Sequence, residues 1–435
     1  MNLVEHAIKY GLKIGADEVH VRYSRSREFS VDLEMNSISR VNYRVGSGLS
    51  ILLFVDKRIA AAAVSNPSEK SVEEAVEKAY KMARASKPNV NWMGLPDPKP
   101  LPKVEGVYDV RLSELEPGEA VEIMKKGLSI VREKGNVNVM QGSLSITVSK
   151  VHIGNSRGID CSEKYTGLNA SLVAVAQEAG KVGSFAYETY SSRKFDLNIE
   201  ELAESVAEKA LSSLHLKPVE SFKGSIVMDY DFSALFFLML TMAYNGFHVW
   251  SGSSPWRNKL GEKVAAERLT IIDDGTLPGG VKSSSFDGEG LPTMRKTIVR
   301  NGILEKYINN TYTARLLNMK TTGNAASPLD VSPSNTIVEP GDWKPEEIIG
   351  SVKKGLFISR YSGMINVVNG VVSGTVKQAF YIENGVKKYP VKECMISSNL
   401  YEMLSNITAI GCETKDKGGI IVPIVKIDNV NIISR

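Results

Sequence analysis

The chain has 435 residues, which is too many for one hydrophobic core and predicts two or three domains. Its net charge of +4 is small and no run of Lys and Arg marks a basic face, so a nucleic-acid partner is not expected. The longest apolar run, residues 232–243, is too short to cross a bilayer, and the N-terminus lacks a secretion-signal pattern, so we expect a cytoplasmic protein with no membrane partner.

The N-terminal half begins with a helix and continues as an antiparallel meander. Residues 2–14 carry apolar side chains at helical spacing. The strands expected next are separated by short turns, which permit only antiparallel pairing. They are residues 18–24, 29–35, 37–44, 49–55 and 58–64.

Helices and a proline-rich loop follow the meander. Ser71 and Glu74 form a capping-box pattern that predicts a helix over 71–86. Five prolines between residues 88 and 103 predict an extended surface loop. A helix over 117–133 starts with Pro117, as the first turn of a helix allows.

Further strands are expected over 136–192, and a helix over 199–214, capped by Asn198, closes this half. We place the domain boundary near 215–223, which gives an N-terminal domain of residues 1–215 and a C-terminal domain of residues 223–435. The second domain opens with a strand over 224–230. An apolar helix then starts at Asp231, a residue type that caps helices.

The C-terminal domain is mainly β in character. Two hairpins carry the Asn-Gly turn signal, at Asn301-Gly302 and Asn384-Gly385. Short helices are expected at 311–318, 345–353 and 399–406, and the last strand begins at Ile420. Strands with few helices and without regular βαβ alternation predict an α+β protein: an N-terminal antiparallel sheet with helices, and a C-terminal sheet or barrel with short helices.

Residues able to carry chemistry are scattered. The five histidines show no metal-ligand spacing, and only His248, beside Trp250, is expected near a cleft; a hydrogen-bonded surface imidazole is the favoured interpretation. Serine-rich loops at 251–254 and 283–285 lack the nucleophile-elbow pattern and are read as flexible loops. The three cysteines, Cys161, Cys394 and Cys412, predict neither a disulfide framework nor a metal site.

Two acidic segments, 273–275 and 287–290, lack the register of a calcium loop and are typical of turns. In the second, Asp287-Gly288-Glu289-Gly290, the glycines allow close backbone approach, so this loop is kept as a structural or peptide-contacting candidate. Arg295 and Arg315 could pair with these acids. The substrate-binding candidates are therefore His248, Asp287, Glu289 and Arg295.

The apolar helix after Asp231 offers no group for polar chemistry. Phe237, Leu238 and Met242 bind no hard metal and move no proton. From the residues alone, this segment is a core helix.

The second half contains several unusual motifs in a fixed order and spacing. They lie in SGSSPWRNKLGEKVA (251–265), LTIIDDGTLPGG (269–280), the stretch 284–325 with FDGEG, NGIL and TTGNA, the stretches 345–358 and 373–391, and SSNLYEMLSNITAIGCET (397–414). These stretches resemble the TldD/PmbA family, the "modulator of DNA gyrase" group, also described as a peptidase family. The order and spacing of the motifs make the resemblance specific. The N-terminal half matches more loosely, through residues 34–66 and the turn at 155–158.

The resemblance implies a zinc helix in some members and not in others. TldD-like members carry HExxxH just before the GSS segment and look like zinc metalloproteases. Counted back from residues 261–265, the HE positions fall on Phe237 and Leu238, and the second His position falls on Met242. Catalytic members also supply a cysteine ligand near the C-terminus, where this chain has Lys415, so Cys412 is read as an unconnected thiol. No residue here is therefore expected to be catalytic or to bind a metal.

The resemblance is to the PmbA (TldE) branch, which pairs with a TldD-like catalytic subunit in a protease for unfolded peptides. It implies a dimer, with zinc only in the TldD-like partner. A stand-alone homodimer that binds peptides without catalysis stays open. An independent enzyme that uses His248 with Asp287 or Glu289 also stays open.

Overall fold

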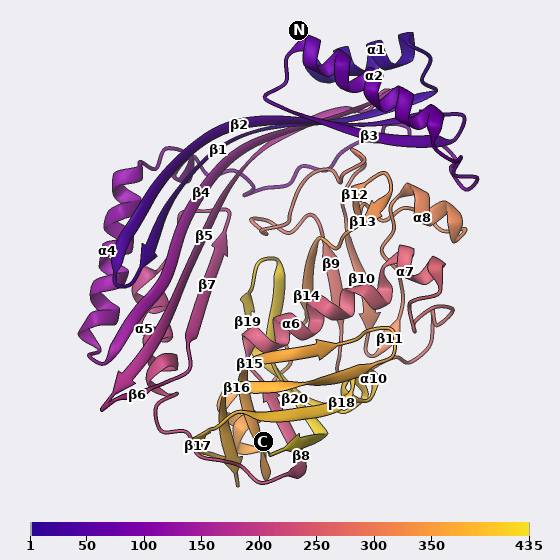
Figure 1. The fold of residues 1–435 in the computed structure, drawn as a ribbon. Coiled ribbons are helices and arrows are strands. Elements are labelled where there is room, and N and C mark those ends of the chain that lie inside the picture. The colour runs from indigo at the N-terminus through magenta and orange to yellow at the C-terminus, as the bar shows by residue number, and fades with distance from the viewer. Residues whose placement is uncertain (1, 435) are drawn as a thin grey trace.

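A computed structural model describes residues 2–434; residues 1 and 435, at the outer ends of the two expected domains, lie outside it. The chain forms two large sheets (Figure 1). Strands from residues 18–192 build a seven-stranded sheet, and strands from residues 222–433 build an eleven-stranded sheet. The predicted α+β class is confirmed. Within residues 2–434, no helix is long and apolar enough to cross a membrane.

The first sheet is a long curved band, and it is antiparallel as predicted (Figure 1). Its strands run in the order β3-β2-β1-β4-β5-β6, and β7 also pairs with β5. They are β1 (Glu18–Glu34), β2 (Ser37–Val55), β3 (Arg58–Ser65), β4 (Val137–Asn155), β5 (Asp160–Glu178), β6 (Lys181–Val182) and β7 (Ala186–Ser192).

The expectation of two short strands within residues 18–35 is wrong, because β1 is one strand of 17 residues. Its polar middle, around Arg25, continues as strand because β2 pairs with it on one side and β4 on the other. The predicted strands at 37–44 and 49–55 likewise join into β2. In β1 the two paired neighbours satisfy the backbone hydrogen bonds on both sides whatever the side chains are.

Helices cover the convex face of the first sheet (Figure 1). At one end α1 (Leu3–Lys13) and α2 (Glu69–Ala85) pack on β1 and β2, and at the other α4 (Pro117–Glu133) and α5 (Ile199–Leu211) pack on β4 and β5. A single turn, α3 (Val110–Ser113), precedes α4. The predicted capping box is displaced: Ser68, not Ser71, caps α2, and its hydroxyl accepts from the Ser71 amide.

The second sheet contains a closed barrel. Strands β8, β15, β16, β18 and β20 pair in sequence, and β20 pairs back onto β8 to close the ring. The expectation of a barrel-like sheet is confirmed.

The strands of the C-terminal half are β8 (Phe222–Met228), β9 (Ile271–Asp274), β10 (Arg295–Arg300), β11 (Ile303–Leu304), β12 (Ala325–Ser327), β13 (Asp330–Val331), β14 (Asn335–Val338), β15 (Lys354–Ile365), β16 (Val371–Glu383), β17 (Val386–Val391), β18 (Cys394–Asn399), β19 (Ile407–Asp416) and β20 (Ile420–Ile433).

Both predicted Asn-Gly hairpins are confirmed. Asn301 and Gly302 join β10 to β11, and Asn384 and Gly385 join β16 to β17, all with positive φ between 48° and 78°. The helices of this half are α6 (Tyr230–Leu240), the 3-10 turn η1 (Thr241–Tyr244), α7 (Gly246–Ser251), α8 (Thr311–Leu316), α9 (Pro345–Gly350) and α10 (Leu400–Ser405).

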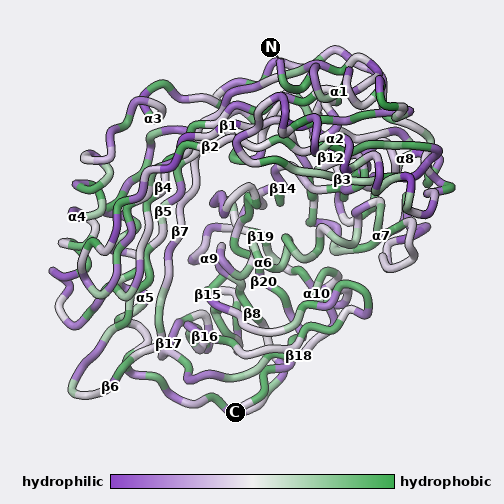
Figure 2. Tube along the Cα trace, turned by 45° about the horizontal axis from the view of Figure 1, so that its top comes forward, coloured by the Kyte–Doolittle hydropathy of each residue, from purple (hydrophilic) through white to green (hydrophobic). Residues whose placement is uncertain are grey.

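The band curves around the C-terminal domain (Figure 1). Side chains of the two domains form small apolar clusters where the domains meet. Val151 and Ile153 of β4 pack with Phe286 and Leu291. Trp92 of the proline-rich loop clusters with Tyr312 of α8. Hydrophobic segments are concentrated through the barrel and α6 (Figure 2), where the largest core of the protein lies.

Candidate functional site between the two sheets

The helix α6 and the η1 turn that continues it pack on the barrel, and their side chains differ in exposure. Phe237 is 1% exposed and belongs to the main core, and Met242 packs partly buried against that core. Leu238 is 41% exposed. The expectation of a core helix therefore holds for Phe237 but is wrong for Leu238, which lies on the open side of α6.

The start of α6 is tied to the first sheet by buried charges. Asp229, not Asp231, caps the helix by accepting from the amides of residues 231 and 232. Asp231 is free to pair with Lys209 of α5 (2.9 Å) and with Lys417 of the β19–β20 turn (2.7 Å). Both lysines also pair with Glu188 of β7, at 2.5 and 3.4 Å. Because each lysine ammonium lies beside both carboxylates, the four charged groups can be buried together.

These charges shift the pKa values of their neighbours. Burial raises the pKa of Asp229 to about 7, and the negative charge of Asp231 adds to the shift. Burial lowers the pKa of Lys209, but the carboxylates of Glu188 and Asp231 outweigh it, so the pKa is raised overall. The cluster therefore keeps its lysines charged.

Lys415, the residue at the position of the family's cysteine ligand, lies beside the first turn of α6. Its Nζ is 5.2 Å from the ring centroid of Tyr230, and 3.9 Å from a carboxylate oxygen of Glu201. Cys412 is exposed on β19 and forms no disulfide. The position of the family's cysteine ligand therefore holds the positively charged ammonium group of Lys415.

A cavity of about 360 Å³ lies between the concave face of the first sheet and the loops of the C-terminal domain. Arg22, Glu163 and Arg193 line it from the first domain, and Lys282 and Asp287 line it from the second. Its wall includes two segments that carry the family resemblance: residues 284 and 286–288, and residues 323–325. Clefts of this size with a few converging polar groups are typical of ligand sites.

The loop at 287–290 is shaped by its own carboxylate. Asp287 accepts backbone hydrogen bonds from Glu289 (2.9 Å), Leu291 (3.1 Å) and Ala325 (3.0 Å), which joins the two wall segments. A Cβ on Gly288 would lie 2.2 Å from the carbonyl oxygen of residue 326, so this position requires glycine. Burial raises the pKa of Asp287 to about 6 although these amides oppose the shift.

Glu289 is 1% exposed, and its carboxylate binds the first residue of α8, which is distant from it in the sequence. Its Oε2 accepts from the amide (2.9 Å) and the hydroxyl (2.8 Å) of Thr311. Its Oε1 is buried and has no hydrogen-bond partner within residues 2–434. Burial, followed by the charge of Asp287, raises the pKa of Glu289 to about 8.

This raised pKa predicts a pH dependence of stability. Because the folded pKa lies above the unfolded value, the stabilising contribution of neutral Glu289 is full below about pH 4 and is lost as pH rises through 8. Glu289→Gln keeps the acceptor for Thr311 but cannot ionise. We expect the variant to gain a few degrees in Tm relative to wild type between pH 5 and pH 8, measured by calorimetry. A Tm difference that stays constant across this range would contradict the assignment.

The other predicted site residues lie in separate places. His248 lies on α7, and its Nδ1 is 3.0 Å from the hydroxyl of Ser253. In the described chain, none of the hydrogen bonds of Asp287 or Glu289 involves His248. Arg295 pairs with Asp274 (3.1 Å), which confirms the expected pairing with this acidic segment. The expectation of a turn over 273–275 is wrong for its two acids, because Asp273 and Asp274 are the last residues of strand β9. Arg315 donates to the carbonyl oxygen of Gly94, and its charge opposes part of the rise in the pKa of Glu289.

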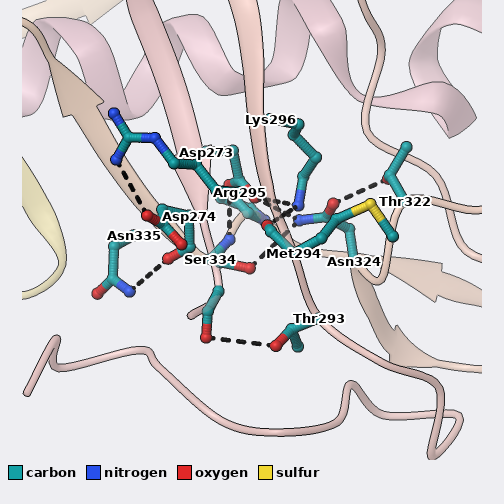
Figure 3. A network of polar contacts seen from close by, with 12 residues as sticks. Asp273, Asp274, Thr293, Met294, Arg295, Lys296, Thr322, Asn324, Ser334 and Asn335 are labelled. Carbon is teal, nitrogen blue, oxygen red and sulfur yellow. Dashed lines mark hydrogen bonds and ion pairs between the residues drawn. The ribbon is translucent and has the colours of Figure 1, made fainter. Parts of the chain in front are cut away.

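A buried network that sequence reasoning missed supports the cavity wall (Figure 3). Lys296 Nζ lies 2.8 Å from Asp273 Oδ1, and the two side chains are 2% and 0% exposed. Asp273 also accepts from Asn324 Nδ2 (2.9 Å) and from the Ser334 amide (2.7 Å). Alternation along β10 could have suggested that Lys296 points inward beside exposed Arg295; no local pattern identifies Glu163, Arg193 or Asn324.

Comparisons with known proteins agree with this architecture. Three family profiles match: PmbA/TldA metallopeptidase domain 1 over residues 19–83, the central domain over 110–214 and the C-terminal domain over 221–434. Metalloprotease PmbA of Escherichia coli O157:H7 is 26% identical, over 98% of this chain and 96% of its own. A metalloprotease PmbA homolog of Buchnera aphidicola is 30% identical, over 74% and 72%.

The fold comparison gives the same result. The crystal structure of TldE from Thermococcus kodakarensis has a TM-score of 0.92 at 27% identity, covering 99% of this chain and 100% of its own. All three domains of the family are thus present here in order, on the same fold. The chain belongs to the TldD/PmbA family of metallopeptidases.

Proposed function

We propose that this chain is a non-catalytic subunit, similar to PmbA and TldE, that pairs with a TldD-like zinc metalloprotease acting on unfolded peptides. The observation that carries the proposal is the composition of α6 and of the η1 turn that follows it. Phe237, Leu238 and Met242 stand where the resemblance places HExxxH, and none offers the imidazole or carboxylate that zinc and its water require.

The surroundings of α6 support the proposal. Lys415 brings a positive charge to the position of the family's cysteine ligand. Within residues 2–434, no three His, Cys, Asp or Glu side chains are grouped so as to hold a metal ion. The ion pairs of Asp231 instead join the helix to α5 and to the β19–β20 turn. In this proposal α6 is a structural element, and the zinc site belongs to the partner subunit.

A second candidate, the stand-alone homodimer that binds peptides, is favoured by a free strand edge. Residues 37–46 of β2 pair with β1 on one side, whereas pairing with β3 starts only at Gly48. Val41, Tyr43 and Val45 are exposed there. An extended peptide could add to such an edge through main-chain hydrogen bonds.

Coexpression with a TldD-like protein tests the first candidate. We expect the two chains to elute together from size exclusion, with stoichiometric zinc and peptidase activity on an unfolded protein such as casein. The chain purified alone is expected to hold no stoichiometric zinc and to lack this activity. The control is a TldD-like protein whose motif glutamate is changed to glutamine, which should still form the complex but stay inactive.

Two outcomes would reject the proposal. One is separate elution of the two proteins with unchanged peptidase activity, and the other is stoichiometric zinc in this chain alone. Activity that survives in a metal-stripped preparation and disappears with His248→Ala would favour an independent enzyme instead. Affinity of the lone chain for unfolded peptides, without complex formation, would favour the homodimer.

A further inference from the structure

We propose that the cavity between the two sheets binds the C-terminal carboxylate of a peptide. Three cations from separate parts of the chain meet there: Arg22 of β1, Arg193 just after β7, and Lys282 in the loop after β9. The inference rests on the proposed function in one respect, since that function supplies peptides as the class of ligand.

These cations have unused hydrogen-bond donors. Within residues 2–434, the side chains of Arg22 and Lys282 donate no hydrogen bond, and no carboxylate forms an ion pair with them or with Arg193. The guanidinium of Arg193 donates to the carbonyl oxygen of Thr166 (3.0 Å) and lies 4.6 Å from the ring centroid of Tyr165. Stacking on an aromatic ring orients the guanidinium without neutralising it.

The acids of the cavity are already engaged elsewhere. One oxygen of Glu163 accepts from the hydroxyl of Ser284 (2.7 Å), and the other accepts from the amide (3.0 Å) and the hydroxyl (2.7 Å) of Ser285. Asp287 is satisfied by its three backbone amides. Both carboxylates therefore hold the loops of the wall. The charge of Glu163 acts on Arg193, and the charges of Asp273 and Asp416 act on Lys282, but none of them forms a direct ion pair with these cations in the described part of the chain.

The wall also has the chemistry expected for a peptide end. Val151, Ile153 and Phe286 give it an apolar side next to the charged one. A planar guanidinium matches the two oxygens of a carboxylate, and the apolar side can receive the terminal side chain. The cavity of about 360 Å³ suits the last residues of a chain better than a folded domain.

The test is a binding titration with a matched pair of peptides. An unstructured, N-acetylated decapeptide is prepared as the free acid and as the C-terminal amide, and each is titrated into the full-length protein by fluorescence anisotropy. We expect the free acid to bind at least about tenfold more tightly, since a charge-assisted hydrogen bond is lost in the amide. Added salt or inorganic phosphate should weaken the free acid more than the amide.

Two variants test whether the preference for the free-acid peptide arises in the cavity. Arg22→Gln and Lys282→Gln, both at exposed positions, are each expected to reduce the preference for the free acid severalfold. Arg25→Gln is the control, because Arg25 is exposed on the opposite face of β1. Equal affinity for the two peptides, no binding of either, or an equal loss in the Arg25→Gln control would overturn the inference.

The two proposals can fail separately. If Arg22→Gln and Lys282→Gln still form the complex with a TldD-like protein but acid and amide bind alike, only the carboxylate site is rejected. If the preference for the free acid is found and no TldD-like partner associates, the site stands and the subunit role is rejected.

Discussion

Replacing Phe237 with alanine is expected to lower the free energy of unfolding by about 3–5 kcal/mol. The ring is 1% exposed and packs edge-on against Phe236, with ring centroids 5.4 Å apart. Removing it leaves a cavity in the barrel core, and the close-packed neighbours can fill only part of it. Urea unfolding followed by fluorescence gives the difference in stability.

Leu238→Ala is the matched control, one residue along the same helix. Because Leu238 is 41% exposed, its truncation is expected to cost less than about 1 kcal/mol. Equal losses in the two variants would mean that α6 is not seated on the barrel as described. The same asymmetry predicts that Phe237→His, combined with Leu238→Glu and Met242→His, would destabilise the protein, because its first imidazole would be buried in an apolar core.

Lys296→Met is expected to cost about 3–5 kcal/mol, since it leaves the Asp273 carboxylate buried without a counter-charge. The pair is 2.8 Å apart with both side chains inaccessible to solvent. Asp273 also holds Asn324 and the Ser334 amide, so the loss should loosen the cavity wall as well. Faster hydrogen exchange at residues 323–334 would show this loosening.

The neighbouring pair provides the comparison. Arg295 bonds to Asp274 at 3.1 Å, but its side chain is 55% exposed, so Arg295→Met is expected to cost no more than about 1 kcal/mol. Combining Lys296→Met with Asp273→Asn should recover part of the stability, because no buried charge remains. A loss for Lys296→Met no larger than that for Arg295→Met would contradict a buried ion pair.

Features that depend on a few adjacent residues could be predicted. The Asn-Gly hairpins at 301 and 384 follow from the positive φ that only such residues adopt easily. The helix starting at Pro117 and the Asn198 cap follow from the chemistry of a helix N-terminus. Caps were misplaced where two candidates stood close together, as with Asp229 and Asp231, because only packing decides which one takes the cap.

The candidate site could be predicted from the sequence less completely than these local features. The loop at 287–290 was identified by its composition, and it does line the cavity, but its carboxylates bond to backbone rather than to His248. Glu163 reaches residues 284 and 285 from a strand more than a hundred positions earlier. Such contacts have no local signature, because their partners are brought together by strand pairing and domain packing.

The sequence by itself determined that this segment carries Phe237, Leu238 and Met242 and therefore no HExxxH, because that motif is a local pattern of neighbouring residue types. The first two lie on α6, and Met242 lies in the η1 turn that continues it. Only the tertiary structure decided which of these side chains is buried and which faces outward. It also assembled Arg22, Arg193 and Lys282 around one cavity. Pairing of distant strands and the curvature of the first sheet set those positions, and no single stretch of the chain determines either of them.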